Sequence, residues 1–327
     1  MTIAALPSGS AKFGRQGALM RLRRNDILFK NCTYAAAVFV LILLSAVTIS
    51  LLIGAWPAMQ AFGFGFLTSQ SWNPVTERFG GLAPIYGTLV TSFIAMLFAV
   101  PIGIGIAVFL TEACPLPLRR PIGTAIELLA GIPSIIFGIW GLFVLAPFLQ
   151  TIVQPALIDA FGSVPILSSL FAGPPYGIGV LTAALILAIM VLPFITAISR
   201  DVFATVPPVL KEAAYGLGCT RWEVVRNVVI PHTRVGIIGG IMLGLGRALG
   251  ETMAVTFVIG NAHKVTPSLL APGTTISATI ANEFTEAVGD LYTSSLVLLG
   301  LILFVITLIV LSIARYLLWR LEQRAKG

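Results

Sequence analysis

Six long apolar segments dominate this chain of 327 residues and restrict its possible folds. Each segment can cross the roughly 30 Å hydrocarbon core of a bilayer, which takes about 20 residues of helix. Hydrophobic residues make up 57% of the sequence and charged residues only 10%, which excludes an ordinary soluble globule. We therefore expect an all-α polytopic membrane protein. Its six transmembrane helices are predicted at 35–56, 83–110, 122–149, 177–198, 235–259 and 292–314.

The basic residues outside these segments lie almost entirely on one side of the membrane. Six Lys or Arg residues precede the first span, two lie between the second and third, five between the fourth and fifth, and four follow the sixth. Only Arg78 and Lys264 lie in the remaining loops, and Arg247 lies inside a span. Because basic loops stay on the cytoplasmic side, both termini are predicted to be cytoplasmic. This asymmetry explains the net charge of +7 better than a nucleic-acid partner does.

The same pattern predicts how the chain is organised. No cleavage signal follows the first apolar run, so this run is predicted to remain as a membrane span. The segment 161–175 is apolar but rich in Gly and Pro, which indicates an outer loop with short or re-entrant pieces. The predicted parts are a basic cytoplasmic tail at 1–30, a first transmembrane helix at 31–56, an outer loop at 57–82 and a core of five transmembrane helices at 83–327. Within that core we expect outer loops at 150–176 and 260–291 and a cytoplasmic loop at 200–234.

Signatures of several other function classes are missing from the sequence. The chain has no G-x-x-x-x-G-K-[ST] segment, so it is not predicted to hydrolyse ATP itself. The glycines at 239, 240, 244, 246 and 250 follow no strand and are interpreted as helix-packing positions. The three cysteines lack metal or disulfide spacing. His232 and His263 are the only histidines, which makes a membrane enzyme the weakest hypothesis.

The cytoplasmic segment 206–231 is the most polar interruption of the apolar sequence. Pro208 suits the first turn of a helix, and Gly218 suits the break after it. Thr220 and Glu223 have capping-box spacing for a second short helix, which Pro231 is expected to end. From these residues alone, an interfacial amphipathic hairpin joining two spans is as good an interpretation as a docking segment for a partner.

Two charged residues lie in the predicted fifth span. Arg247 and Glu251 are four residues apart, which would place them on one face of a continuous helix. Charges at membrane depth are costly and normally face a bundle interior or a pathway. One hypothesis is a buried ion pair that fixes helix packing. The other is an anion site in which Arg247 donates to a tetrahedral oxyanion, while Glu251 holds or gates that arginine.

A third charge, Glu127, lies near the cytoplasmic end of the predicted third span. Its side chain could extend to the membrane surface, or it could line a pathway. The nearby Gly131, Pro133 and Ser134 are expected to break the regular helix at this point. Such a break suits a pore-lining kink or an ordinary packing kink equally well.

The spacing of the cytoplasmic segment resembles a known family motif. Glu212-Ala-Ala, then Gly218, Val228 and Ile230-Pro231 resemble the EAA loop of permease subunits in bacterial ABC importers. The resemblance implies the type I ABC importer permease (MetI-like) fold, in which this loop forms coupling helices that dock into a cleft of the ATPase. It would place Glu212, Ala213, Ala214, Gly218, Arg221 and Pro231 at or beside that contact.

Four further segments narrow the resemblance. GRALGETMAV at 246–255, APIYGTLVTS at 83–92, AGIPSIIFG at 130–138 and ANEF at 281–284 are similar to the PstC family, a permease subunit of the bacterial high-affinity phosphate importer. The resemblance implies a location in the bacterial inner membrane, with periplasmic outer loops and phosphate passing Arg247 and Glu251. We place Ser134 and Glu127 on the same path. The implied partners are a second permease (PstA-like), an ATPase dimer (PstB-like) that binds ATP and Mg, and a periplasmic phosphate-binding protein (PstS-like). No cofactor or metal is expected on this chain.

Two alternatives remain open from the sequence. A permease for another oxyanion, such as sulfate or molybdate, would use the same guanidinium chemistry. An ATP-independent secondary anion transporter could use Arg247, Glu251 and Glu127 as coupling charges.

Overall fold

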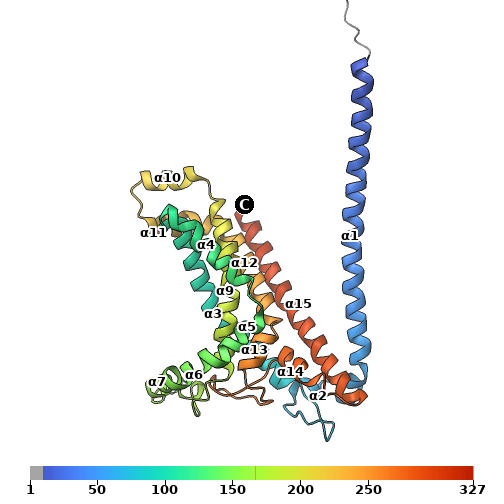
Figure 1. The fold of residues 1–327 in the computed structure, drawn as a ribbon, viewed down its shortest axis with the longest axis vertical. Helices are drawn as coiled ribbons and strands as arrows, with labels where there is room; N and C mark the ends of the chain where they lie inside the picture. Colours follow the sequence, from blue (N-terminus) through green and yellow to red (C-terminus); the bar gives the residue numbers. More distant parts are fainter. Residues whose placement is uncertain (1–9, 166, 327) are drawn as a thin grey trace, which may run out of the picture. The chain divides into compact units, whose positions relative to one another are not determined.

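The computed structural model describes the backbone of residues 10–165 and 167–326 and the side chains of residues 25–165, 167–320 and 323. These segments are mainly helical and contain one isolated β-bridge, between Asn73 and Arg78, and no longer strand. The helices are α1 (Ser10–Phe62), α2 (Gly65–Thr68), α3 (Leu82–Val108), α4 (Leu116–Ala130), α5 (Ser134–Trp140), α6 (Ala146–Phe148), α7 (Gln154–Phe161), α8 (Leu167–Leu170), α9 (Val180–Ala204), α10 (Pro208–Gly216), α11 (Arg221–Val224), α12 (Ile230–Leu249), α13 (Met253–Val258), α14 (Ile276–Glu283) and α15 (Asp290–Lys326) (Figure 1).

Short π-helical turns extend or join several of these helices: the first ends the stretch that α3 begins, and the other three join consecutive helices. They are η1 (Phe109–Ala113), η2 (Gly141–Leu145), η3 (Leu149–Val153) and η4 (Val225–Val229). Among the described residues, six helical stretches are then long and apolar enough to cross a membrane, as the sequence predicts. They are Asn25–Phe62, Leu82–Ala113, Ser134–Phe161, Val180–Ala204, Arg221–Leu249 and Asp290–Arg320.

The chain divides into two compact units, residues 1–53 and 54–327. In the first unit, the described side chains of α1 are almost all exposed and mostly apolar, as suits a helix surrounded by lipid. The last turns of α1 belong to the second unit. There the Ala58 N–H donates to Ser294 Oγ of α15 at 2.9 Å.

The centre of the second unit is formed by α3, α9 and α12, which pack closely because small residues face larger ones. A Cβ on Gly244 of α12 would lie 2.9 Å from Val191 Cγ1 of α9. A Cβ on Gly103 of α3 would lie 3.0 Å from Ile195 Cγ2. Such contacts let helix backbones approach closely in a membrane. The expected packing role is thus confirmed for Gly244, while Gly239 and Gly246 line a cleft.

The third span differs from its predicted bounds of 122–149. Helix α4 ends at Ala130, and a new helix begins at Ser134 and continues through π-turns to Phe161. Pro133 lacks an N–H and precedes the first helical turn of α5, which explains the break. The expected interruption is present, but Glu127 lies on the separate helix α4 rather than inside a continuous span.

The fifth span also differs from its predicted bounds of 235–259. It begins at Arg221, ends at Leu249 and is followed after a break by α13. Glu251 lies in that break. The prediction that Arg247 and Glu251 share one face of a continuous helix is therefore wrong, because the helix ends at the intervening Gly250.

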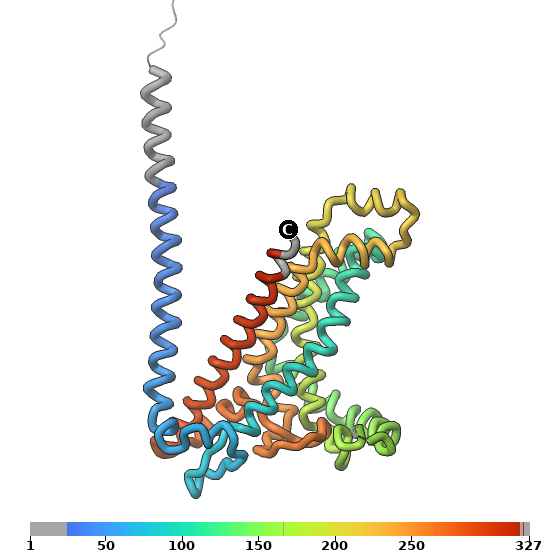
Figure 2. Tube along the Cα trace, turned by 180° about the vertical axis from the view of Figure 1, so that it is seen from behind, coloured from blue at the N-terminus to red at the C-terminus, as the bar shows by residue number. Residues whose placement is uncertain are grey.

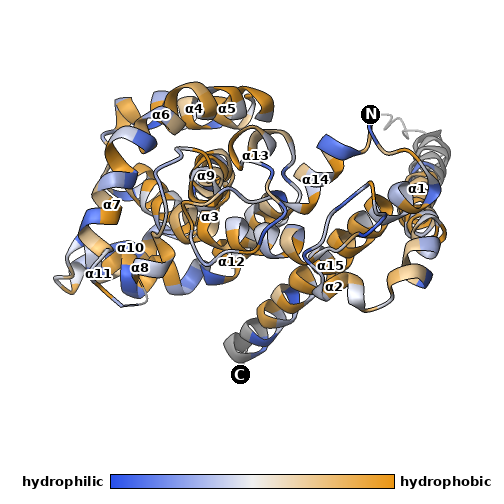
Figure 3. Cartoon of the chain, turned by 90° about the horizontal axis from the view of Figure 1, so that it is seen from below, coloured by the Kyte–Doolittle hydropathy of each residue, from blue (hydrophilic) through white to orange (hydrophobic). Residues whose placement is uncertain are grey.

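The two ends of the second unit carry different loops (Figures 1 and 2). Helices α10 and α11 lie at one end, where α15 also terminates. At the opposite end lie α2, α7, α14 and the loops that contain Arg78 and Lys264. Between these ends, hydrophobic residues colour much of α4, α5 and α15 (Figure 3). This distribution suits a bundle surrounded by lipid and apolar partner surfaces.

Candidate functional site

The segment 206–231 forms the two helices that its sequence predicts. Helix α10 follows Pro207 and has Pro208 in its first turn. Gly218 has a φ of +87°, in the left-handed region that favours glycine, and it turns the chain toward α11. Thr220 and Glu223 form a capping box, with the Thr220 N–H donating to Glu223 Oε2 at 2.7 Å. These local signals in the sequence are sufficient to specify the bend.

Pro231 does not end the second helix, contrary to the sequence prediction. The helix runs on through η4 into α12, with Pro231 near the start of α12 and exposed. The π-turn immediately before Pro231 changes the hydrogen-bond register where the ring would otherwise clash and an N–H is missing. As a result, α11 and the fifth span form one continuous helical stretch, Arg221–Leu249.

Two contacts attach α10 to the rest of the bundle. Ala214 is buried in an apolar cluster with Phe203 and Val224. Lys211 Nζ lies 2.6 Å from Glu112 Oε1 of η1. Lys211 is therefore paired inside the chain rather than free for a partner. Ala214 likewise positions α10 and is not available at the surface.

Other residues of α10, α11 and the bend between them form an exposed surface. Glu212, Ala213 and Arg221 are exposed, as is Gly218. Large apolar side chains lie among them, with Leu217 86% exposed and Trp222 63% exposed. Exposed apolar side chains rimmed by charges are typical of a protein contact surface.

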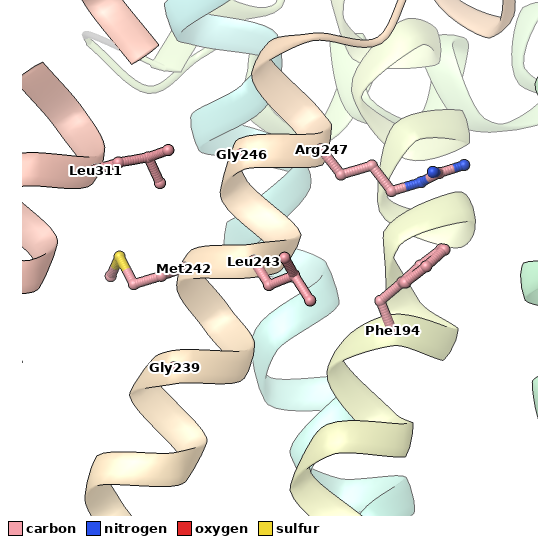
Figure 4. Close-up of a pocket in the computed structure, with 7 residues that line it drawn as sticks. All are labelled: Phe194, Gly239, Met242, Leu243, Gly246, Arg247 and Leu311. Carbon is pink, nitrogen blue, oxygen red and sulfur yellow. The ribbon is translucent and has the colours of Figure 1, made fainter. Parts of the chain in front are cut away.

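Arg247 lies in a cleft of about 430 Å³ between α9, α12 and α15 (Figure 4). Its guanidinium Cζ lies 4.5 Å from the centre of the Phe194 ring of α9. Its Nε is buried without a hydrogen-bond partner, and no described carboxylate forms an ion pair with it. The predicted pairing of Arg247 with Glu251 is thus absent from the described part of the chain. The other residues lining the cleft are Gly239, Met242, Leu243, Gly246 and Leu311.

Glu251 and Ser134 lie at the starts of two neighbouring helices. Glu251 Oε1 accepts a hydrogen bond from the Ala254 N–H of α13 at 3.3 Å, and Ser134 is the first residue of α5. A Cβ on Gly138 would lie 3.1 Å from Ala254 Cα, so the two helices touch there. Gly141, further along, similarly faces Val258. The two helices therefore run in the same direction, and Ser134 and Glu251 each lie about one turn before the contact between Gly138 and Ala254.

Glu127 forms a contact that is separate from the Arg247 cleft. Its Oε1 lies 2.7 Å from Arg200 Nη1, which joins α4 to α9. Arg200 also pairs with Asp201 at 2.9 Å. The structure therefore does not bring Glu127 together with Arg247.

The loops at the end of the bundle opposite α10 contain a polar cluster that the sequence did not indicate. Glu283 accepts hydrogen bonds at Oε2 from Trp72 Nε1, at 2.9 Å, and from the hydroxyl of Tyr292. His263 Nε2 lies 3.2 Å from Glu283 Oε1, and its ring stacks on Trp72. Burial lowers the pKa of His263, partly opposed by Glu283. The cluster ties three outer segments together, and no local sequence spacing could have revealed it.

Comparison with known proteins places the chain in a family. Residues 99–323 match the family model of binding-protein-dependent transport system inner membrane components. The chain is 70% identical over 320 residues to the phosphate transport system permease protein PstC of Mesorhizobium japonicum, covering 98% of this chain and 97% of that protein. The chain belongs to the PstC family of phosphate transport permeases. PstC of Pasteurella multocida is 58% identical, covering 91% of this chain and 93% of that protein.

The fold of this PstC-family chain also matches a solved importer. A subunit of the bacterial alginate ABC transporter, solved in complex with an alginate pentasaccharide-bound periplasmic protein, has a TM-score of 0.58 at 17% identity, covering 91% of this chain and 95% of that one. This similarity confirms the type I ABC importer permease fold. As a PstC-family member, the chain is a multi-pass membrane component of a multi-subunit ABC importer and is not itself the catalytic subunit. All the candidate residues above, from Glu127 to Glu251, lie inside the matched region.

Proposed function

We propose that this chain is the permease subunit through which a bacterial ABC importer moves inorganic phosphate into the cell. The observation that carries the proposal is the Arg247 guanidinium, which lies in a cleft at membrane depth without a described carboxylate partner. A fixed guanidinium with free N–H donors suits a tetrahedral oxyanion. Relatives at 70% and 58% identity carry the name of a phosphate permease, which favours phosphate over sulfate or molybdate. Membership in an ABC permease family also argues against an ATP-independent secondary transporter.

In this proposal, energy reaches the chain through the exposed surface of α10 and α11. A PstB-like ATPase dimer, which would bind ATP and Mg itself, docks on Glu212, Ala213, Gly218 and Arg221. ATP-driven closure of that dimer shifts α11, and the continuous stretch Arg221–Leu249 carries the shift to Arg247. The cleft would then open alternately to the two sides of the membrane.

The orientation and the other partners follow from the two ends of the bundle. Both termini would lie in the cytoplasm with the coupling segment, and the loops that contain Arg78 and Lys264 would lie in the periplasm of a bacterium with an inner membrane. A PstA-like second permease would complete the pathway. A PstS-like phosphate-binding protein would deliver phosphate to the outer loops. The supporting observations are the distribution of basic residues and the termination of α15 at the same end of the bundle as α10.

The other charged and polar candidates take different roles. We place Glu251 and Ser134 on the path beside Arg247, because breaks at membrane depth leave backbone N–H groups that an anion can bind. Glu127 is assigned to holding α4 against α9, since its carboxylate already pairs with Arg200. Ala214 and Pro231 would support the coupling surface without contacting the ATPase.

Uptake of labelled phosphate tests the proposal. Phosphate-starved cells lacking this chain would be complemented with the wild type, with Arg247→Gln or with Arg247→Lys, and labelled sulfate would be the control. We expect phosphate uptake with the wild type only, because Lys keeps the charge but not the planar fork. Complex assembly should be equal for all three. Restoration of sulfate uptake instead of phosphate uptake would contradict the substrate, and unchanged uptake by Arg247→Gln would contradict the role of this arginine.

A second experiment tests whether the exposed surface of α10 and α11 binds the ATPase. Glu212→Arg should reduce the amount of ATPase that co-purifies with the permease, whereas Glu286→Arg, an exposed acidic residue of the outer loops, should not. Normal co-purification with Glu212→Arg would show that α10 does not bind the ATPase through this residue.

A further inference from the structure

Phe194 is the aromatic side chain in the cleft that contains Arg247. It projects from α9, directly after Pro193, and its ring centre lies 4.5 Å from the guanidinium carbon. Figure 4 shows the Arg247 side chain extending from α12 to lie over this ring, while Met242 and Leu311 lie on the other side of α12. The arginine therefore reaches across to the neighbouring helix, where Phe194 meets it.

The Phe194 ring is the main group in the cleft that can stabilise the charge of Arg247. Apart from Arg247 and Phe194, the lining residues are glycines and aliphatic side chains. None of these can accept a hydrogen bond through its side chain, apart from the weak thioether of Met242. An aromatic face attracts a guanidinium through its quadrupole, and the attraction grows where water is excluded. The contact with Phe194 thus offsets part of the cost of a charge at this depth.

We propose that Phe194 is a positioning residue for phosphate passage: its ring holds the face of the Arg247 guanidinium and leaves the N–H edge open to the anion. The inference rests on the proposed function. All five N–H donors of a guanidinium lie in its plane, so contact with one face occupies none of them. Because Nε of Arg247 is itself buried, the N–H groups of the two terminal nitrogens are the ones that would meet the anion. A carboxylate partner would instead occupy those donors, and an anion would have to displace it.

Loss of the ring should weaken anion binding more than turnover. In Phe194→Leu the apolar volume is largely kept, but the quadrupole is lost and the arginine can adopt other rotamers. Arg247 and Phe194 are both half-buried, and a cation–π contact between the exposed and the desolvated case corresponds to about a tenfold change in affinity. We therefore expect the KM for phosphate uptake to rise about tenfold while the maximal rate changes less than about twofold. Phe194→Tyr keeps the ring and should behave like the wild type.

The experiment uses the complete importer, purified and reconstituted, in two assays. The first measures the KM and maximal rate of phosphate uptake for the wild type, Phe194→Leu and Phe194→Tyr. The second measures the rate at which phenylglyoxal, a reagent for accessible guanidinium groups, modifies Arg247, as read by mass spectrometry without phosphate. Phe143→Leu is the matched control, because Phe143 is 72% exposed on the outside of the bundle.

The expected result is a raised KM and faster Arg247 modification in Phe194→Leu alone. Equal impairment of Phe194→Leu and Phe194→Tyr would overturn the inference, because the ring would then not be what matters. An unchanged KM together with an unchanged modification rate in Phe194→Leu would overturn it as well. If the wild type itself failed to take up phosphate, the proposed function would be wrong. The modification rates alone would then decide whether Phe194 positions Arg247.

Discussion

The ion pair between Lys211 and Glu112 is expected to hold helix α10 in place. The two side chains are 20% and 10% exposed and lie 2.6 Å apart. Breaking a fully buried pair costs about 3–5 kcal/mol, whereas an exposed pair contributes about 0–1 kcal/mol. At this intermediate burial we expect Glu112→Gln or Lys211→Met to destabilise the docked α10 by about 1–3 kcal/mol. That corresponds to a rise of about 5- to 150-fold in local opening.

Hydrogen exchange of the α10 backbone amides in the assembled importer measures this opening directly. Each single substitution should accelerate exchange across 208–216, and the charge swap Glu112→Lys with Lys211→Glu should recover at least half of the lost protection. Asp201→Asn, which breaks the more exposed pair with Arg200, should leave α10 unchanged. Unaltered exchange in the single variants, or a swap no better protected than they are, would refute the idea that this pair positions α10.

Three further predictions test the packing at Gly87, the polar cluster around Glu283 and the N-terminal cap of α11. Gly87→Ala would place a Cβ 1.9 Å from the Thr274 carbonyl oxygen. The purified complex should therefore lose about 1–3 kcal/mol or more of stability, seen as a lower thermal midpoint. In the control Gly105→Ala, on the same helix, the new Cβ meets nothing within 4 Å, and the midpoint should not change. The pKa of His263 is lowered in the folded protein, so its contribution to stability is present above about pH 6.5 and is lost as the pH falls further. In His263→Gln the thermal midpoint should therefore decrease less on acidification than in the wild type. An equal decrease in both proteins would contradict this. Thr220→Ala removes the cap of α11, and exchange of its first amides should rise by the equivalent of about 1 kcal/mol, with no change at α9.

Sequence reasoning succeeded where the signal was local. Pro208, Gly218 and the Thr220–Glu223 box specify a helix, a bend and a second helix through the φ angles and hydrogen bonds of adjacent residues. Apolar length alone was sufficient to predict six spans. The break before Ser134 was also predictable, since Pro133 cannot donate a backbone hydrogen bond.

Sequence reasoning failed where contacts between distant segments determine the structure. Pro231 normally stops a helix, but here a π-turn and the packing of the fifth span carry the helix through. Arg247 and Phe194 belong to different spans, and the sequence of α9, which contains two phenylalanines, does not indicate which one lies under the guanidinium. The ion pair between Lys211 and Glu112 likewise joins residues that are far apart in the sequence, so no local spacing indicates it. These contacts depend on how the helices are arranged, which residue spacing does not determine.

The most direct test of the central claim is ATP-driven uptake of labelled phosphate into proteoliposomes containing the complete importer. The account predicts accumulation with the wild-type chain, no accumulation when a non-hydrolysable ATP analogue replaces ATP, and loss of uptake in Arg247→Gln despite normal assembly. Phosphate accumulation that continued without ATP hydrolysis, or that was unchanged in Arg247→Gln, would contradict it.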